Sequence, residues 1–192
     1  MSLKNLLQGQ GEAYYLSEFF QKPVADNYLE RLMEEIEWEE AEIRMFGKLV
    51  KIPRLQAWYG NKEYSYSGLK MTPLPWTKIL TEIKERVEEF AEVTYNSVLL
   101  NLYRDGNDSM GWHSDDEREL GRNPNISSLS LGEARVFQLR HRAKAFPTVK
   151  VPLQHGSLLL MKGEIQHHWQ HQIAKTKRPI APRVNLTFRT IL

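Results

Sequence analysis

RVNLTFR, at residues Arg183–Arg189, alternates polar and apolar side chains from end to end. In an extended strand, alternate side chains point to opposite faces, so this stretch predicts a strand with one apolar and one polar face. The polar face carries two guanidinium groups, from Arg183 and Arg189. A guanidinium matches a carboxylate in shape and charge. The two arginines could therefore bind a dicarboxylate, or they could simply face solvent.

Short β-rich runs follow Val93 and continue to the end of the chain, separated by Gly, Pro, Asn and Asp. Strands are predicted at Ser97–Tyr103, Ile126–Leu131, Arg135–Arg140, Thr148–Pro152, Ser157–Met161 and Arg183–Thr190, with further strands or hairpins at Arg44–Gln56 and Tyr59–Ser67. Many short strands with frequent turn residues indicate a sandwich or jelly roll. The predicted fold class is mainly β with flanking helices (α+β), with a double-stranded β-helix (jelly roll) as its core.

Two helices are expected to brace this core. The first follows Pro23, takes Asp26 as its N-cap and has one apolar face at helical spacing. That face consists of Tyr28, Leu29, Leu32, Met33 and Ile36. The second helix runs from about Trp76 to Phe90, with Pro75 at its start and a similar apolar stripe. We interpret both stripes as core packing.

The composition narrows the possible chemistry. With 192 residues, a formal net charge of +2 and 41% hydrophobic residues, the chain fits one compact domain. It has no cysteine, which excludes disulfides, thiolate metal sites and repair by alkyl transfer to a protein thiol. Any metal must be held by histidine and carboxylate, a ligand set that suits non-haem iron. No stretch reads as a signal peptide or membrane span, so we expect a soluble intracellular protein.

A metal-binding pattern begins at His113-Ser114-Asp115. On an extended segment, residues two positions apart point to the same side, so His113 and Asp115 could hold one metal ion. A second histidine would complete the facial arrangement that leaves positions open on iron. The candidates are His141, His155, His167, His168 and His171, and a jelly roll could bring the cluster at 167–171 beside His113. The residues alone do not choose among the three histidines of that cluster. His141 and His155 are expected at the surface.

Polar residues on the strand before His113 could bind the same dicarboxylate as the two arginines. Asn101 and Tyr103 lie two positions apart on the strand predicted at Ser97–Tyr103, so their side chains share a face. Both could donate hydrogen bonds to the dicarboxylate for which the two arginines are suited.

These motifs together resemble the AlkB family of Fe(II)- and 2-oxoglutarate-dependent nucleic-acid dealkylases, most closely the animal-type DNA-repair members. The matching blocks are Asn101–Gly106, Gly111–Glu117, His168–His171 and Arg183–Arg189. Their order and spacing agree, including the 12 positions from His171 to Arg183 (183 − 171 = 12). The similarity extends back to about Phe46, and the block at residues 183–189 is its most specific part.

The resemblance assigns roles at the centre of the site. It implies that His113, Asp115 and His171 are the catalytic iron ligands, with His168 as a structural neighbour. It also implies a set of cosubstrate-binding residues. Arg183, Tyr103 and Asn185 would hold the distal carboxylate of 2-oxoglutarate, Arg189 and Asn101 would lie at the end that chelates iron, and Thr187 would lie among them.

The resemblance also assigns substrate-binding residues. Asp116 and Glu117 fall where family members approach the base. Tyr64, Tyr66 and Ser67 resemble a lid whose aromatic rings could stack on a flipped base. Met45, Phe46 and Gly47 resemble an apolar finger that fills the gap left in duplex DNA.

The implied function is oxidative dealkylation of N-alkylated bases in DNA, of the 1-methyladenine and 3-methylcytosine type. The implied cofactors are Fe(II), 2-oxoglutarate and O2, and an aldehyde is released. The chain would divide into an arm (1–20) and a dioxygenase domain (21–192), with helices and lid in 21–95 and the catalytic jelly roll in 96–192. Alternatives are an RNA-base demethylase, a protein hydroxylase or a non-catalytic nucleic-acid-binding module.

The sequence departs from the animal duplex-repair members in a few places. The loop between Tyr59 and Tyr64 is shorter, and Ser114 stands where those members carry a basic side chain. The arm lacks partner-docking and nuclear-targeting features. We therefore expect a monomeric, bacterial-type cytoplasmic enzyme that acts on alkylated DNA, with RNA as the alternative substrate, and that does not bind a membrane.

Overall fold

Two antiparallel sheets form the centre of the protein. A computed structural model describes residues 3–45, 48–62, 64–66 and 69–192. The larger sheet contains β1 (Glu12–Leu16), β2 (Glu39–Met45), β3 (Lys48–Gly60), β6 (Ser97–Tyr103), β8 (Ile126–Gly132), β11 (Ser157–Lys162) and β13 (Arg183–Arg189). The smaller sheet contains β7 (Met110–His113), β9 (Arg135–His141), β10 (Val149–Leu153) and β12 (Trp169–Ile173). A separate hairpin pairs β4 (Tyr64–Tyr66) with β5 (Leu69–Met71).

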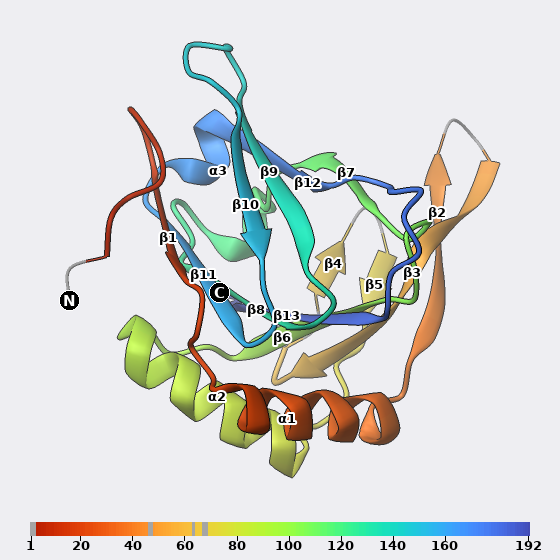
Figure 1. The fold of residues 1–192 in the computed structure, drawn as a ribbon. Coiled ribbons are helices and arrows are strands. Elements are labelled where there is room, and N and C mark those ends of the chain that lie inside the picture. Colours follow the sequence, from red (N-terminus) through yellow and green to blue (C-terminus); the bar gives the residue numbers. More distant parts are fainter. Residues whose placement is uncertain (1–2, 46–47, 63, 67–68) are drawn as a thin grey trace.

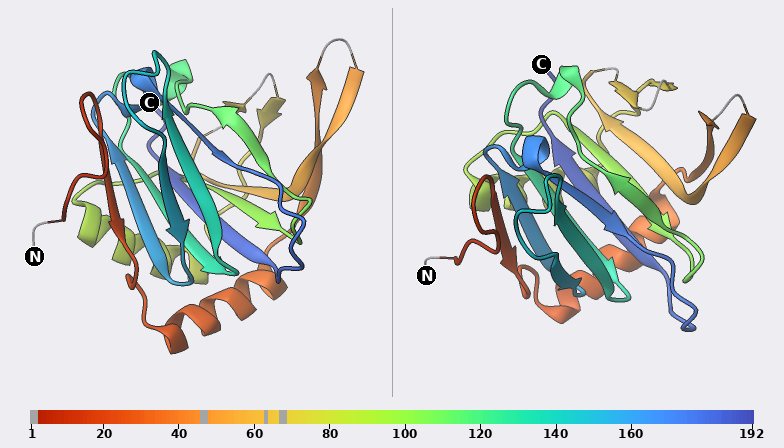
Figure 2. Two further views of the ribbon diagram at one scale, coloured as in Figure 1. Left: turned by 45° about the horizontal axis from the view of Figure 1, so that its top comes forward. Right: turned by 90° about the horizontal axis from the view of Figure 1, so that it is seen from above.

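The strand order is that of a jelly roll. The larger sheet runs β1-β11-β8-β13-β6-β3-β2 and the smaller one β10-β9-β12-β7. The two sheets face each other, and Figures 1 and 2 show them as stacked layers. Apolar side chains from both fill the space between, among them Phe137 and Leu139 of β9 and Leu159 of β11. Along β9 the side chains alternate between buried and more exposed positions, as expected for a sheet with one face in the core. The predicted fold class is confirmed.

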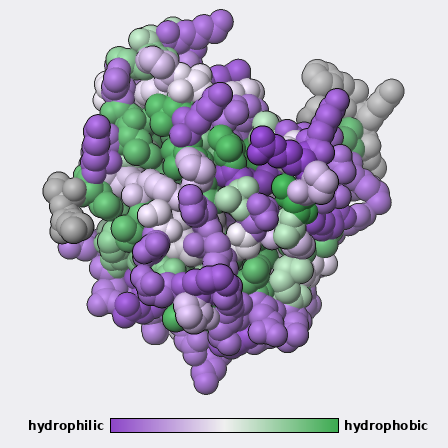
Figure 3. Space-filling model, viewed as in Figure 1, coloured by the Kyte–Doolittle hydropathy of each residue, from purple (hydrophilic) through white to green (hydrophobic). Residues whose placement is uncertain are grey.

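Two helices cover the other face of the larger sheet, α1 (Lys22–Glu35) and α2 (Lys78–Ala91). Leu32 of α1 and Ile79 and Ile83 of α2 are completely buried there. Polar side chains cover the lower part of the view in Figure 3, where the helices lie. The predicted apolar stripes are core packing except at Met33 and Phe90, each of which is 37% exposed. A 3-10 turn, η1 (Arg118–Leu120), lies between β7 and β8 in the chain, and a short helix, α3 (Ile165–His168), lies between β11 and β12.

The helix starts differ from the sequence prediction. Gln21, not Asp26, is the N-cap of α1, because Pro23 already occupies the first helical turn. Asp26 lies inside the helix, where it accepts a hydrogen bond from Lys22 Nζ at 2.7 Å. The second helix begins at Lys78, and the side chain of Thr77 caps it by accepting from Leu80 N.

The N-terminal segment contributes to the larger sheet. β1 pairs antiparallel with β11, from Glu12 opposite Lys162 to Leu16 opposite Leu158. Ala13 is completely buried there. The division of the chain at residue 20 stays a prediction. In the described part of the chain, no helix has the length and apolarity needed to cross a membrane.

Candidate active site

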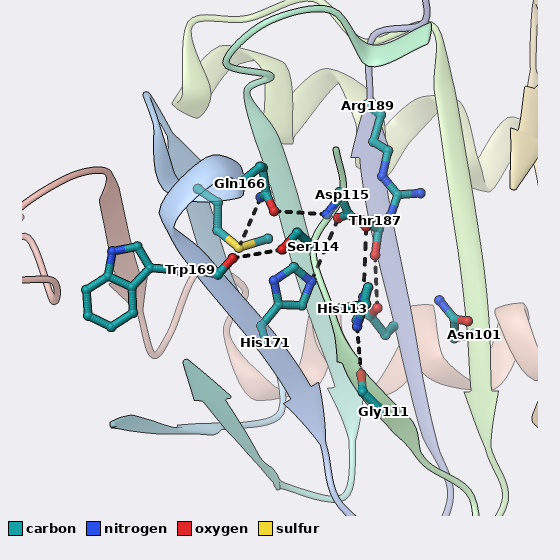
Figure 4. Close-up of polar contacts among 12 residues, drawn as sticks. Asn101, Gly111, His113, Ser114, Asp115, Gln166, Trp169, His171, Thr187 and Arg189 are labelled. Atoms are coloured by element: carbon teal, nitrogen blue, oxygen red, sulfur yellow. Dashed lines mark hydrogen bonds and ion pairs between the residues drawn. The ribbon is translucent and has the colours of Figure 1, made fainter. Parts of the chain in front are cut away.

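The pairing of β7 with β12 brings together two histidines that are 58 positions apart in the chain (171 − 113 = 58). His113, the last residue of β7, lies directly opposite His171 of β12. The centroids of their rings are 4.2 Å apart with an edge-on angle of 71°. Asp115 follows in the loop after β7, and only 2% of its surface is exposed. Figure 4 shows the three side chains converging between the sheets.

The polar atoms of these side chains surround one point. His113 Nε2 lies 3.9 Å from Asp115 Oδ1, and His171 Nε2 lies 4.0 Å from Asp115 Oδ2. One ligand atom from each residue lies within 4.8 Å of the other two, the only such group among the described residues. Two imidazoles and one carboxylate are the facial ligand set of non-haem Fe(II) oxygenases. The donor set therefore fits a ferrous ion.

A backbone contact sets the tautomer of His113. Its Nδ1 lies 2.8 Å from the carbonyl oxygen of Gly111, so Nδ1 carries the proton and donates it. The lone pair is then on Nε2, the nitrogen that faces Asp115. Metal-binding histidines are commonly oriented in this way, by a hydrogen bond from the second ring nitrogen.

Asp115 is held in its charged form. Burial alone would raise the pKa of Asp115, but the nearby Arg189 guanidinium outweighs it, helped by the two imidazoles, and the pKa lies well below its ordinary value. Arg189 Nη2 is 3.0 Å from Asp115 Oδ1. The backbone N–H of Asp115 donates to Gln166 Oε1 at 3.0 Å, which fixes the loop.

Both imidazoles are neutral at neutral pH. Burial is the main cause, lowering the pKa of His171 to about 3 and that of His113 below its ordinary value. Neutral imidazoles and a charged carboxylate are the forms that bind a metal ion, since a ligand must first lose its proton. The electrostatics of the site thus agree with its geometry.

The other candidate histidines are engaged elsewhere. His155 Nε2 lies 3.0 Å from Asp26 Oδ1, His167 Nε2 lies 2.8 Å from Asn123 Oδ1, and His168 lies near Glu164. The expectation that His141 is exposed was wrong, because it is 6% exposed and packs edge-on against Trp169. It ends β9, whose core-facing residues are buried in alternation.

These ligands line a cavity whose volume is about 520 Å³ when the space open to solvent is counted. Its wall is the polar face of the larger sheet, where Arg183 lies opposite Tyr103 and Asn185 opposite Asn101. The cavity thus collects all the predicted cosubstrate residues, namely Asn101, Tyr103, Arg183, Asn185, Thr187 and Arg189.

Arg183 has hydrogen-bonding capacity to spare. It is 2% exposed, and its Nη2 donates to Ser130 Oγ at 2.8 Å. Within the described residues, its Nε and Nη1 are buried without a hydrogen-bond partner. Burial lowers the pKa of Arg183 to about 10, so it is still a cation at neutral pH. A buried cation with unmet donors on a cavity wall fits an anionic ligand such as a carboxylate.

Neighbouring polar side chains define the rest of this wall. The Tyr103 ring centroid is 5.1 Å from the Arg183 guanidinium carbon. Asn185 Nδ2 donates to Ser128 Oγ and Leu129 O, both at 2.9 Å, and its Oδ1 accepts from Thr187 Oγ1 at 3.0 Å. These bonds fix the two β13 side chains before any ligand arrives.

Asp116, which follows Asp115 in the chain, and its partner Arg142 lie outside the cavity lining and are more exposed; we call this pair the mouth of the site. Asp116 Oδ2 accepts from Arg142 Nη2 at 2.9 Å, and 50% and 41% of the two side chains are exposed. The same Arg142 nitrogen donates to Ser114 Oγ at 2.8 Å, while Ser114 Oγ donates to Trp169 O. Arg142 therefore supplies a cation near the position where the sequence departs from the duplex-repair members. Glu117, the next residue after Asp116, is partly buried.

The predicted lid and finger lie partly outside the described residues. Phe46, Gly47 and Ser67 lie outside the described residues. Met45 ends β2, and Tyr64 and Tyr66 are the ends of β4, but only their backbone is described.

Sequence reasoning missed other polar residues of the site. Gln166 on α3 is 1% exposed and binds the backbone of Asp115. Arg54 and Gln56 on β3 both donate to Asn101 Oδ1. Their alternation with Leu55 and Ala57 was a usable signal of a polar strand face. The contact of Gln166 had no such signal, because it depends on how α3 packs.

Comparisons with known proteins agree with this geometry. The 2OG-Fe(II) oxygenase superfamily matches residues 12–189. Human alpha-ketoglutarate-dependent dioxygenase alkB homolog 3 is 44% identical over 176 residues, covering 87% of this chain and 62% of the human protein. Mouse DNA oxidative demethylase ALKBH2 is 40% identical over 198 residues, covering 97% of this chain and 83% of the mouse protein. The solved structure of OsALKBH1 shares the fold, with a TM-score of 0.63 at 14% identity over 96% of this chain and 100% of that one.

The comparisons adjust two expectations. The family match begins at residue 12, well before Phe46, so the likeness reaches further back than the motifs indicated. The bacterial-type assignment is not borne out, because the relatives named above are mammalian. The chain spans 62% of the length of human alkB homolog 3.

Proposed function

Because this chain belongs to the AlkB family within the 2OG-Fe(II) oxygenase superfamily, we propose that it is an Fe(II)- and 2-oxoglutarate-dependent dioxygenase that dealkylates bases in DNA. One observation carries the proposal. The His113, Asp115 and His171 cluster adjoins the cavity into which Arg183 presents unmet donors. A metal ion and an anionic cosubstrate would thus be bound side by side.

The side chains of this protein bind and orient the reactants. His113, Asp115 and His171 would hold the iron, with Asp115 kept charged by Arg189. Arg183 would bind the distal carboxylate of 2-oxoglutarate as a two-pronged donor. Bound iron and cosubstrate supply the oxidation, in which O2, 2-oxoglutarate and the N-alkyl carbon give succinate, CO2 and a hydroxylated alkyl group. The hydroxylated group then leaves as an aldehyde, formaldehyde for a methyl lesion.

The carboxylates that follow Asp115 in the chain support a base as the substrate. A base must leave its stack to reach the ligands, at a cost of about a few kcal/mol. Asp116 and Glu117 provide carboxylates near the metal cluster, and carboxylates favour cationic lesions such as 1-methyladenine and 3-methylcytosine. Tyr64, Tyr66 and Ser67 are proposed as the lid, and Met45, Phe46 and Gly47 as the finger. The relative named a DNA oxidative demethylase supports DNA as the substrate class.

The direct test is turnover of defined lesions. Purified protein with Fe(II), 2-oxoglutarate and O2 should repair a 1-methyladenine oligonucleotide, with one succinate and one formaldehyde per lesion. His113→Ala should abolish repair and leave the circular dichroism spectrum unchanged. Full turnover by that variant would remove His113 from the iron site.

A substrate panel separates the alternatives. Methylated DNA, methylated RNA and a peptide are assayed in parallel, with single-stranded and duplex DNA compared. DNA is expected to be the best substrate, and higher turnover of RNA or peptide would replace the DNA assignment. Iron-independent lesion binding without succinate formation would indicate a non-catalytic module. A monomeric state and a cytoplasmic location belong to the same proposal, testable by light scattering and by imaging of the tagged chain.

A further inference from the structure

Arg54 and Gln56 are buried polar side chains to which the proposed reaction assigns no task. They are 3% and 2% exposed. Residues two apart on a strand share a face, so both point from β3 toward the polar face that carries Asn101. Burying such groups costs free energy unless each finds a hydrogen-bond partner. Both find the same one, the side-chain oxygen of Asn101.

Arg54 determines which way the Asn101 amide is turned. Arg54 Nε donates to Asn101 Oδ1 at 2.6 Å. A guanidinium has donors only, so the Asn101 atom that it meets must be the oxygen. The amide nitrogen therefore points away from β3. In Figure 4 it lies on the side of His113 and Thr187, and Asn101 lines the cavity.

Gln56 adds a second donor to the same oxygen. It lies directly opposite Asn101 in the β3–β6 ladder, and its Nε2 is 3.0 Å from Asn101 Oδ1. Two donors use both lone pairs of the oxygen. A turned amide would instead place donor against donor in a buried location, which is unfavourable. The orientation of Asn101 is thus fixed before any ligand binds.

We propose that Arg54 and Gln56 are positioning residues that hold the Asn101 amide nitrogen toward bound 2-oxoglutarate as a ready hydrogen-bond donor. This inference rests on the proposed function, which makes the cavity a cosubstrate site. Arg54 also steadies the approach to the metal ligands, because its Nη1 donates to Ser109 O at 3.1 Å, just before β7. One guanidinium therefore links the Asn101 donor to the strand that carries His113.

Gln56→Glu tests the orientation directly, because it keeps the side-chain shape and replaces the donor by an acceptor. The new carboxylate offers Arg54 a charged acceptor in place of Asn101 Oδ1, so neither donor then holds the amide oxygen. Asn101 should then turn its nitrogen toward β3, to donate to the carboxylate. Affinity for 2-oxoglutarate, measured without O2 and with Mn(II) in place of Fe(II), should fall about 10-fold or more, as for one lost hydrogen bond to a charged group. The thermal midpoint should stay close to that of the unaltered chain.

A second readout reports the amide itself. In nitrogen-15-labelled protein, the Asn101 side-chain resonances should shift on addition of 2-oxoglutarate, and Gln56→Glu should suppress that shift. Gln154→Glu is the matched control, since it makes the same chemical change on an exposed side chain in the β10–β11 turn. It should leave both readouts unchanged.

A double-mutant cycle separates positioning from general damage. In an Asn101→Ala background, Gln56→Glu should have no further effect on 2-oxoglutarate affinity. Equal losses in both backgrounds would overturn the inference, as would normal affinity in the single variant while the unaltered chain binds 2-oxoglutarate. If the unaltered chain binds no 2-oxoglutarate at all, the proposed function fails and takes the inference with it.

Discussion

The cavity lining and the Asp116–Arg142 pair at the mouth of the site differ in how their charges are held. In the cavity lining, Asp115, His171 and Arg183 are 2%, 3% and 2% exposed. Strand pairing fixes the two strands that carry His171 and Arg183, and a buried hydrogen bond fixes the loop that carries Asp115. At the mouth, the ion pair of Asp116 with Arg142 has about half of each side chain exposed. The same types of charged group therefore work in two different dielectric environments.

This difference separates chemistry from selectivity. Charges interact strongly where water is excluded and weakly where solvent and salt screen them. Buried groups can hold a metal ion and a keto acid in one fixed arrangement. Exposed pairs can rearrange at little cost when a base approaches. We expect changes in the cavity lining to abolish turnover and changes at the mouth to shift the choice of lesion.

The largest contrast is expected between two neighbouring carboxylates. Asp115→Asn removes a proposed metal ligand and the charge that pairs with Arg189. Outer-shell changes at metal sites typically cost about 10–100-fold, so loss of a ligand should lower succinate formation by more than about 100-fold. Iron content and succinate formation are measured together.

Asp116→Asn makes the identical chemical change one position further along. It should leave iron content and 2-oxoglutarate affinity within about 3-fold of the unaltered chain, because the carboxylate is exposed. Its effect should fall on the KM for a cationic lesion. Equal losses of iron in the two variants would show that the cavity lining and the mouth of the site do not have separate roles.

The second largest effect is expected at Arg183. Arg183→Met removes two donors that face the cavity, each worth about 1.5–3 kcal/mol to a charged acceptor, so the 2-oxoglutarate Kd should rise by at least about 10-fold. The ligand-free protein should lose little stability, because the cation is buried with unmet donors. An unchanged Kd would contradict the assigned role. Arg142→Met, at the mouth, should leave that Kd unaltered.

An intermediate effect is expected in acid. Burial alone would raise the pKa of Asp108, but hydrogen bonds from Arg104 outweigh it and the pKa lies below its ordinary value of 3.8. The unfolded chain protonates this carboxyl first as the pH falls. The stabilisation is therefore present above about pH 4 and lost as the pH falls through the lower, folded value.

Asp108→Asn should remove this pH dependence. At neutral pH it should cost about 1–3 kcal/mol of unfolding free energy, as for a buried charged hydrogen-bond network. Urea melts from pH 7 down to pH 2 measure both quantities. A variant whose stability falls as steeply with acid as that of the unaltered chain would show that the acid response comes from other carboxyls.

The smallest effect is expected for the ion pair at the mouth. Arg142→Ala should change the unfolding free energy by less than about 1 kcal/mol, since exposed pairs contribute little. It should change the ratio of KM values for cationic and neutral lesions, with a difference that shrinks at high salt. A salt-independent change would indicate a direct contact with the lesion instead.

Much of the fold was predictable because it depends on local patterns. The strands predicted at Ser97–Tyr103 and Ser157–Met161 agree with the structure to within one residue, since alternation and turn residues mark their ends. The N-cap of α1 was wrong, because Pro23 at the first turn settles the start before Asp26 is reached.

The site was predictable only in part. His113-Ser114-Asp115 was visible as a local pattern, whereas the residues alone left three histidines, His167, His168 and His171, as the third candidate ligand. The register of β7 with β12 selects His171, and register is a long-range property. The donors from Arg54 and Gln56 to Asn101 depend likewise on the β3–β6 ladder.

The most direct measurement is equilibrium dialysis of Fe(II) without O2, with and without 2-oxoglutarate. The unaltered chain should bind one iron per chain and hold it more tightly when 2-oxoglutarate is present. His171→Ala should lose the iron, and Arg183→Met should keep the iron but lose the tightening. Iron binding that survives His171→Ala, or that ignores 2-oxoglutarate in the unaltered chain, would contradict a metal centre built beside an arginine-lined cosubstrate slot.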